Sequence, residues 1–205
     1  MAGTVAVTAQ DMARYHSFTM SALKLETPPE TTWDFRLGFN TARNRNLAVS
    51  YIAGDWMFFL DDDQTFEPKV LLKLLDRNVD IIQALTPMRV PPFGPHAYVW
   101  KDNDFQRADP SLVPQTGISA WDGIACGCLL VKRHVFEAIE PPWFEVSGDG
   151  RSDDLYFCRK AKNAGFTCHL DSDTRSSHMT ITKVSPEYHN GQWGGVLCFG
   201  DDSLG

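Results

Sequence analysis

Long apolar runs are absent from this sequence of 205 residues. The longest uninterrupted apolar stretch, residues 56–60, is far shorter than the roughly 20 residues that a membrane-spanning helix needs. The N-terminus also lacks a basic segment followed by an apolar block, the pattern of a secretory leader. We therefore expect a soluble, cytoplasmic protein without a transmembrane segment.

Paired cysteines and an excess of positive charge are missing as well. The five cysteines are scattered, without two Cys-x-x-Cys pairs or a Cys/His quartet at zinc-finger spacing. This pattern favours free buried thiols over disulfides or a zinc site. The formal net charge of −7 disfavours the broad phosphate-binding surface of nucleic-acid-binding proteins, although it allows a local basic pocket.

Strand-like and helix-like segments alternate along the chain, and no repeat or low-complexity tract divides it. The expected strands are residues 4–8, 31–37, 55–60, 80–85, 123–131 and 166–170. The expected helices are residues 11–25, 41–53, 68–78, 134–139 and 153–164. This alternation predicts a single α/β domain over residues 1–205, with a Rossmann-like, mostly parallel central sheet flanked by helices.

Two regions fall outside this alternation. Residues 86–122 are rich in proline, aromatic and polar residues, which indicates a long functional loop region. Residues 185–205 form a glycine-rich tail in which Gly191, Gly194 and Gly195 leave the backbone unusually free. A mobile flap carrying Trp193 and a frayed terminus are both open interpretations of this tail.

Three aspartates, Asp61, Asp62 and Asp63, directly follow the apolar segment WMFFL. Like charges this close repel one another and need a compensating cation, for which a hard divalent ion is suited. Taken alone, these three aspartates are explained equally well as a solvated strand end.

A second acidic pair, Asp153 and Asp154, begins a predicted helix, where capping the free backbone N–H groups is a sufficient explanation.

Two basic features complete the set of candidates. His178 follows the last predicted strand, where a neutral imidazole can complete a coordination sphere begun by carboxylates. Arg43 and Arg45 share one predicted helix, and one of them can reach a bound diphosphate while the other stays solvated. The sequence has no P-loop and no G-x-G-x-x-G, so a phosphate must be held by metal and side chains.

The order of these signals is more informative than any one of them. The strings ARN, FFLDDD, GCLLVKRHVFEAI, DDLYFCRKAKNAGF and SSH resemble the GT-A fold glycosyltransferases similar to family 2. The resemblance runs from about Val5 to His178. It implies metal-dependent transfer of a sugar from a nucleotide-diphosphate donor to an acceptor hydroxyl, with Mn²⁺ or Mg²⁺ as the metal. A mixed carboxylate and imidazole shell favours Mn²⁺.

The resemblance also implies roles for individual residues. Asp61 and Asp63 match the D-x-D carboxylates and, with His178, are the candidate metal residues. Asp63 would ligate the metal, and Asp61 would lie near the donor ribose or the metal-bound phosphate. His178 matches the family's later metal ligand. Asp154 matches the catalytic base of inverting members, beside Asp153 where many relatives have glutamate, which leaves the division of labour within this pair open.

The remaining donor contacts are assigned more loosely. Arg43 and Asp62 are expected near the donor phosphates, and Thr8 stands where family members often hold the nucleobase, in a segment that departs from the family's pattern. The donor sugar, the nucleobase and the acceptor stay open.

Two other functions account for part of the pattern. A sugar-phosphate nucleotidyltransferase also combines an α/β sheet with carboxylate-bound metal, but would normally show a glycine- and lysine-containing loop near the N-terminus, and none is present. A non-catalytic carbohydrate-binding protein would use exposed Trp100, Trp121 and Trp143 to stack on sugars. The two acidic clusters and His178 argue against it.

Overall fold

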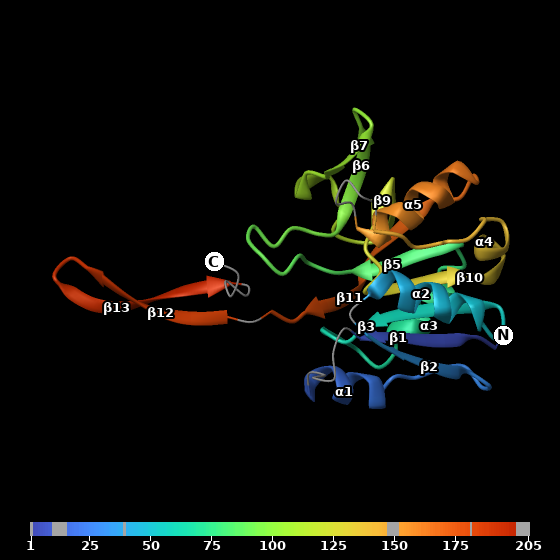
Figure 1. The fold of residues 1–205 in the computed structure, drawn as a ribbon, viewed down its shortest axis with the longest axis horizontal. Helices are drawn as coiled ribbons and strands as arrows, with labels where there is room; N and C mark the ends of the chain where they lie inside the picture. Colours follow the sequence, from blue (N-terminus) through green and yellow to red (C-terminus); the bar gives the residue numbers. More distant parts are fainter. Residues whose placement is uncertain (1, 10–15, 39, 147–151, 181, 200–205) are drawn as a thin grey trace.

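A mixed sheet of eight strands forms the centre of the molecule (Figure 1). The computed structural model describes residues 2–9, 16–38, 40–146, 152–180 and 182–199. In spatial order the strands are β2 (Thr32–Leu37), β1 (Thr4–Ala9), β3 (Trp56–Asp61), β10 (Cys128–Lys132), β5 (Ile81–Leu85), β11 (Cys168–His178) and β4 (Gln64–Phe66), with β8 (Ile118–Trp121) also paired to β11.

The sheet is largely parallel, as the sequence predicted. β1 pairs in parallel with β2 and β3, and β5 pairs in parallel with β11. β10 runs antiparallel to both β3 and β5, so those two strands point the same way. Five strands therefore share one direction, and their carboxyl ends meet at one edge, where ligands bind in open α/β sheets.

Helices cover both faces of this sheet. One face packs against α2 (Thr41–Ser50), α4 (Arg133–Glu137) and α5 (Asp153–Asn163), and the other against α1 (His16–Leu23) and α3 (Val70–Asp76). β3 is buried on both sides because its side chains alternate: Met57 and Phe59 join the first core, and Phe58 and Leu60 join the second. The predicted α/β architecture is confirmed.

Residues 86–122 are not the long loop that their composition predicted. They contain β6 (Ala97–Lys101), β7 (Asp104–Arg107), a 3₁₀ turn and β8, and β6 pairs with both β7 and β9 (Gly123–Ile124) in a small second sheet. Asp102 and Asn103 form the β6–β7 turn with φ of 54° and 61°, a conformation that Asp and Asn tolerate better than other side chains.

The predicted strand 123–131 is divided in two. Its first part is β9 and its last part is β10, which belong to different sheets. Between them Gly127 passes so close to Gln64 that an added Cβ would lie 1.9 Å from the amide nitrogen Nε2. This close passage brings the backbone of Cys126 and Gly127 to the carboxyl end of β3, where Gly127 O accepts a hydrogen bond from Asp61 N.

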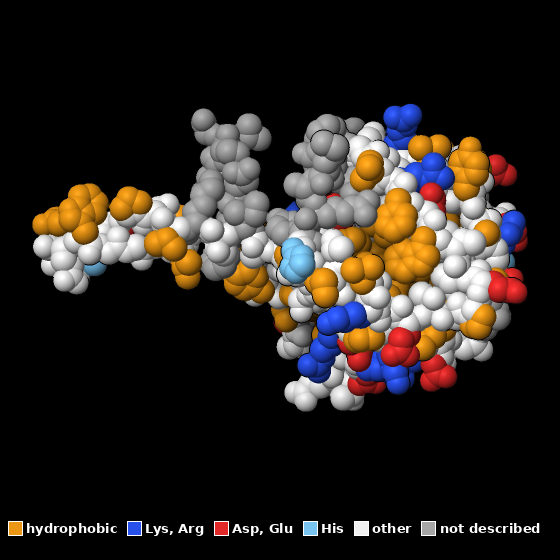
Figure 2. All heavy atoms as spheres, turned by 90° about the horizontal axis from the view of Figure 1, so that it is seen from below, with side chains coloured by type: hydrophobic (Ala, Val, Ile, Leu, Met, Phe, Trp, Pro, Cys, Tyr) orange, Lys and Arg blue, Asp and Glu red, His pale blue; other side chains and the backbone are white. Residues whose placement is uncertain are grey.

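The glycine-rich tail is an ordered hairpin rather than a frayed end over residues 182–199. β12 (Thr182–His189) pairs antiparallel with β13 (Gln192–Phe199), and the hairpin projects from the body (Figures 1 and 2). Asn190 and Gly191 make the turn with φ of 51° and 81°.

Residues 200–205 and the start of the predicted helix 11–25 lie outside the described residues. Within the described chain, no helix is long and apolar enough to cross a membrane.

Candidate active site

A cluster of ion pairs joins α2, β3 and α5 at the carboxyl end of the parallel strands. Its centre is Arg45, whose side chain is only 3% exposed. Arg45 Nη2 donates to both carboxylate oxygens of Asp61, at 2.9 and 3.0 Å. Arg45 Nη1 donates to Asp153 Oδ2 at 2.7 Å and to Asp154 Oδ1 at 2.6 Å. One buried guanidinium therefore holds three carboxylates together.

Asp153 and Asp154 do more than cap their helix. The N-cap position of α5 is Ser152, and both aspartate side chains bond to Arg45. The side chain of Asp153 is 8% exposed, whereas that of Asp154 is 21% exposed and also accepts a hydrogen bond from Cys126 N through Oδ2 at 3.3 Å. Asp154 is therefore the member of the pair that a substrate can reach more easily.

The environment of Asp154 changes its acidity. Withdrawal of its carboxylate from water raises the pKa, and the negative charges of Asp153 and Asp61 add to this effect. The positive charge of Arg45 and the hydrogen bond from Cys126 N act in the opposite direction. The net result raises the pKa of Asp154 to about 6, which leaves it mostly ionised at neutral pH and still able to accept a proton.

A second pair lies beyond the end of β3. His178 Nε2 is 3.2 Å from Asp63 Oδ2, and His178 Nδ1 is 3.0 Å from the carbonyl oxygen of Pro87, to which it donates. Arg89 Nη1 donates to the same Asp63 Oδ2 at 3.0 Å. Burial alone would raise the pKa of Asp63, but the His178 hydrogen bond and the charges of His178 and Arg89 hold it below its usual value.

This pair fits a divalent metal. Metal-binding histidines usually donate their second ring N–H to a carbonyl or carboxylate, as His178 does to Pro87. The other oxygen of Asp63, Oδ1, is buried without a hydrogen-bond partner. Among the described residues no group of three or more His, Cys, Asp or Glu side chains is placed to hold a metal. Oxygens of substrate and water would therefore have to complete the coordination sphere.

Other residues predicted at the site are placed differently. Asp61 is held by Arg45 and does not join the Asp63–His178 pair, whereas Asp62 lies half-buried in the turn that follows β3. Thr8 is buried, and its hydroxyl donates to Asp61 Oδ1 at 2.9 Å, so it supports this carboxylate.

Of the two helix arginines, Arg45 reaches the acidic cluster, whereas Arg43 is exposed. Residues two apart on a helix do not face the same way, so Arg43 points away from Arg45. A sequence signal for Arg45 did exist. It shares the buried face of α2 with Ala42, Ala48 and Val49, and a charged residue on such a face is normally paired.

The three tryptophans proposed as an exposed sugar platform are each half-buried. Trp121 and Trp143 pack against the core, and Trp143 Nε1 donates to Phe136 O at 2.9 Å. Trp100 packs edge-on against Phe105 beneath Arg159. The exposed stacking surface that a carbohydrate-binding protein would need is therefore not formed by these three rings, which are used in packing.

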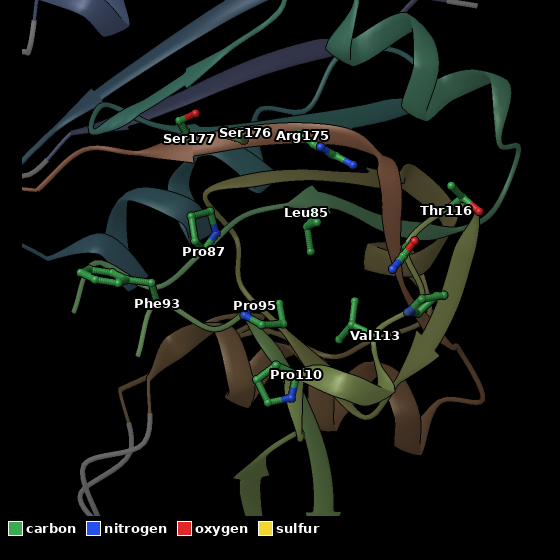
Figure 3. Close-up of a pocket in the computed structure, with 12 residues that line it drawn as sticks. Leu85, Pro87, Phe93, Pro95, Pro110, Val113, Thr116, Arg175, Ser176 and Ser177 are labelled. Carbon is green, nitrogen blue, oxygen red and sulfur yellow. The ribbon is translucent and has the colours of Figure 1, made fainter. Parts of the chain in front are cut away.

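A cavity of about 680 Å³ opens between β11 and the segments that carry Pro87 and Pro110 (Figure 3). Leu85, Pro95 and Val113 point into it, and β11 forms another wall through Arg175 and Ser177. Pro87, whose carbonyl binds His178, also lines it. Its size lies within the range of small-molecule sites.

The fold is of the GT-A type, with acidic residues gathered at the carboxyl ends of its parallel strands. The model of glycosyl transferase family 2 matches residues 35–137, just over half of the 205-residue chain. The chain therefore belongs to this family. The match includes Asp61 and Asp63 and ends before Asp154 and His178.

Solved structures support the fold assignment. A197 from STIV superposes with a TM-score of 0.57 at 15% identity, covering 97% of this chain and 94% of that one. GalNAc-T7, solved with UDP, GalNAc and Mn²⁺, superposes with a TM-score of 0.62 at 11% identity, over 85% of this chain and 43% of that one. No curated protein matches the sequence.

Proposed function

We propose that this glycosyltransferase uses a divalent metal to transfer a sugar from a nucleoside-diphosphate donor to an acceptor hydroxyl, with Asp154 as general base and inversion at the anomeric carbon. The observation that carries this proposal is the partly exposed carboxylate of Asp154, which Arg45 links to Asp61 at the end of β3. Asp63, which forms the carboxylate–imidazole pair with His178, follows two residues beyond Asp61. We also propose that the described chain acts as one transferase domain, because β11 belongs to the central sheet and ends at His178.

Asp63 and His178 are the residues that would hold the metal. A bound Mn²⁺ or Mg²⁺ would supply positive charge that offsets the negative charge gathering on the departing nucleoside diphosphate. The chemistry of the donor set favours Mn²⁺, and GalNAc-T7, of similar fold, was solved with that ion. Asp61 would contact the donor ribose or phosphate side, fixed in place by hydrogen bonds from Thr8 and Arg45.

Asp154 would take the proton of the acceptor hydroxyl as the sugar leaves the donor. Arg45 and Cys126 N hold one oxygen each, which fixes the direction of the carboxylate. Although burial opposes its charge, the neighbouring aspartates raise the pKa of Arg45 above its usual value, so this guanidinium stays charged and cannot compete for the proton. Direct attack by the activated hydroxyl on the anomeric carbon produces inversion.

The experiment has two stages. Incubating pure protein and Mn²⁺ with a panel of nucleotide sugars, and measuring nucleoside diphosphate release, selects the donor. Asp154→Asn is then compared with Asp153→Asn. Asparagine is nearly isosteric with aspartate but takes no proton at neutral pH, so Asp154→Asn should lower turnover by about 10²–10⁴-fold while metal-dependent donor binding persists. Normal turnover by Asp154→Asn, or a severe loss confined to Asp153→Asn, would overturn this assignment.

A further inference from the structure

Arg89 occupies an unusual position for an exposed side chain. It is 57% exposed, yet its guanidinium reaches Asp63 Oδ2, the oxygen that also faces His178 Nε2. It lies two residues after Pro87, whose carbonyl fixes His178, in a loop closed by a hydrogen bond from Met88 N to Gly94 O at 2.9 Å. The root of this loop is therefore tied to the proposed metal site, and Arg89 extends from it over Asp63.

The geometry makes Arg89 and a metal ion competitors. A cation bound between Asp63 and His178 would take up the charge of the carboxylate oxygen that Arg89 now contacts, and two cations on one oxygen repel each other. Arg89 is the partner that can move, because an exposed ion pair contributes little free energy and its side chain is long. Once released from Asp63, the guanidinium of Arg89 would lie next to the ligand that the metal binds, which in the proposed function is the donor diphosphate.

We propose that Arg89 is a diphosphate-binding residue that neutralises Asp63 in the empty site and moves to the donor diphosphate when metal and donor bind. The proposal rests on the proposed function, since it requires the Asp63–His178 metal site. A planar guanidinium binds phosphate through two parallel hydrogen bonds, and it remains charged under all conditions of assay. Arg89 would thus make free metal bind weakly and metal with diphosphate bind tightly.

Arg89→Gln should therefore shift two affinities in opposite directions. Without the competing guanidinium, Mn²⁺ alone should bind about two- to fivefold more tightly, the range expected for an exposed ion pair. At saturating Mn²⁺, where Arg89 has already left Asp63, the affinity for the preferred nucleoside diphosphate should fall by about tenfold or more, as expected for a lost charge-assisted contact. If Arg89 is a surface residue without a role in binding, Arg89→Gln would change neither the Mn²⁺ affinity nor the diphosphate affinity.

The test uses the full chain and calorimetry, first with Mn²⁺ alone and then with UDP, GDP, CDP and ADP at saturating Mn²⁺. Arg133→Gln is the matched control, because Arg133 is an exposed arginine whose ion pair with Glu137 lies on α4, away from the site. Melting curves of both variants should match that of the unmodified protein. Unchanged Mn²⁺ affinity, or unchanged diphosphate affinity, in Arg89→Gln would overturn the proposal.

A third variant separates this proposal from the proposed function. His178→Ala removes one of the two expected metal ligands and should greatly weaken Mn²⁺ binding. If it binds Mn²⁺ as well as the unmodified protein does, the metal site itself is wrong. If it loses Mn²⁺ while Arg89→Gln behaves like Arg133→Gln, the metal site stands and only the role of Arg89 fails.

Discussion

Replacing Arg45 by methionine tests the buried ion-pair cluster, because methionine keeps an unbranched apolar stem and removes the guanidinium. Arg45 makes four hydrogen bonds of 2.6–3.0 Å to three aspartates, all from a side chain that is 3% exposed. Adding the energies of these four hydrogen bonds would overstate their contribution to stability, because burying the guanidinium itself costs free energy. Leaving the carboxylates without their cation should lower the free energy of unfolding by about 3–5 kcal/mol at neutral pH.

The size of this loss should depend on pH. Arg45 is a cause that lowers the pKa of Asp154, so its removal raises that pKa beyond about 6. A carboxyl group whose pKa is higher in the folded than in the unfolded state stabilises the fold more as pH falls through the folded value. The deficit of Arg45→Met relative to the unmodified protein should therefore shrink between pH 7 and pH 5.

Urea unfolding at these two pH values measures both effects. Arg43→Met is the control on the same helix, and its exposed side chain should make it nearly neutral, within about 0.5 kcal/mol. Equal stability of Arg45→Met and Arg43→Met at pH 7 would refute the cluster as a source of stability. A deficit that is the same at both pH values would refute the electrostatic account of it.

Two further outcomes are expected. Turnover should rise with pH through about 6 as Asp154 ionises, and a pH–rate profile without this acidic limb would contradict its role as base. Removing residues 182–205 should leave the melting temperature of the core nearly unchanged, because β12 and β13 pair with each other and not with the central sheet. It should lower turnover or donor affinity if the hairpin acts as a flap; unchanged kinetics would remove the hairpin from the mechanism.

Local patterns were sufficient for the first strands of the central sheet and for its helices α2 and α5, but not for β4 and β8, which were not predicted. The sequence predicted the bounds of four elements to within a few residues: β1, α2, β3 and α5. Apolar periodicity and capping act over short stretches of chain, so they can be recognised locally. The β12–β13 hairpin was missed although its signal was local. His189–Asn190–Gly191–Gln192 contains the Asn-Gly pair that favours a two-residue turn, but the neighbouring glycines were taken as a sign of freedom.

The candidate site was predicted only where sequence order carried information. Asp63 and His178 are 115 positions apart and were associated only through the resemblance to the family. The bonds from Arg45 to Asp153 and Asp154 span 108 and 109 positions, and no local pattern specifies such a contact. Burial of a charge is a property of the packed fold, so the apolar stripe around Arg45 indicated only that it needs a partner.

Arg45 links the two halves of the proposed chemistry. Its Nη2 donates to Asp61, which is proposed to contact the donor, while its Nη1 donates to Asp153 and Asp154, of which Asp154 is proposed to contact the acceptor. A guanidinium is planar and rigid, so the positions of these carboxylates are coupled. A donor group that binds Asp61 and weakens its hydrogen bonds with Arg45 would therefore strengthen the bond between Arg45 and Asp154. Arg45, which holds three carboxylates together at this edge, therefore also lowers the pKa of Asp154 and so would set how strongly the proposed base holds its proton.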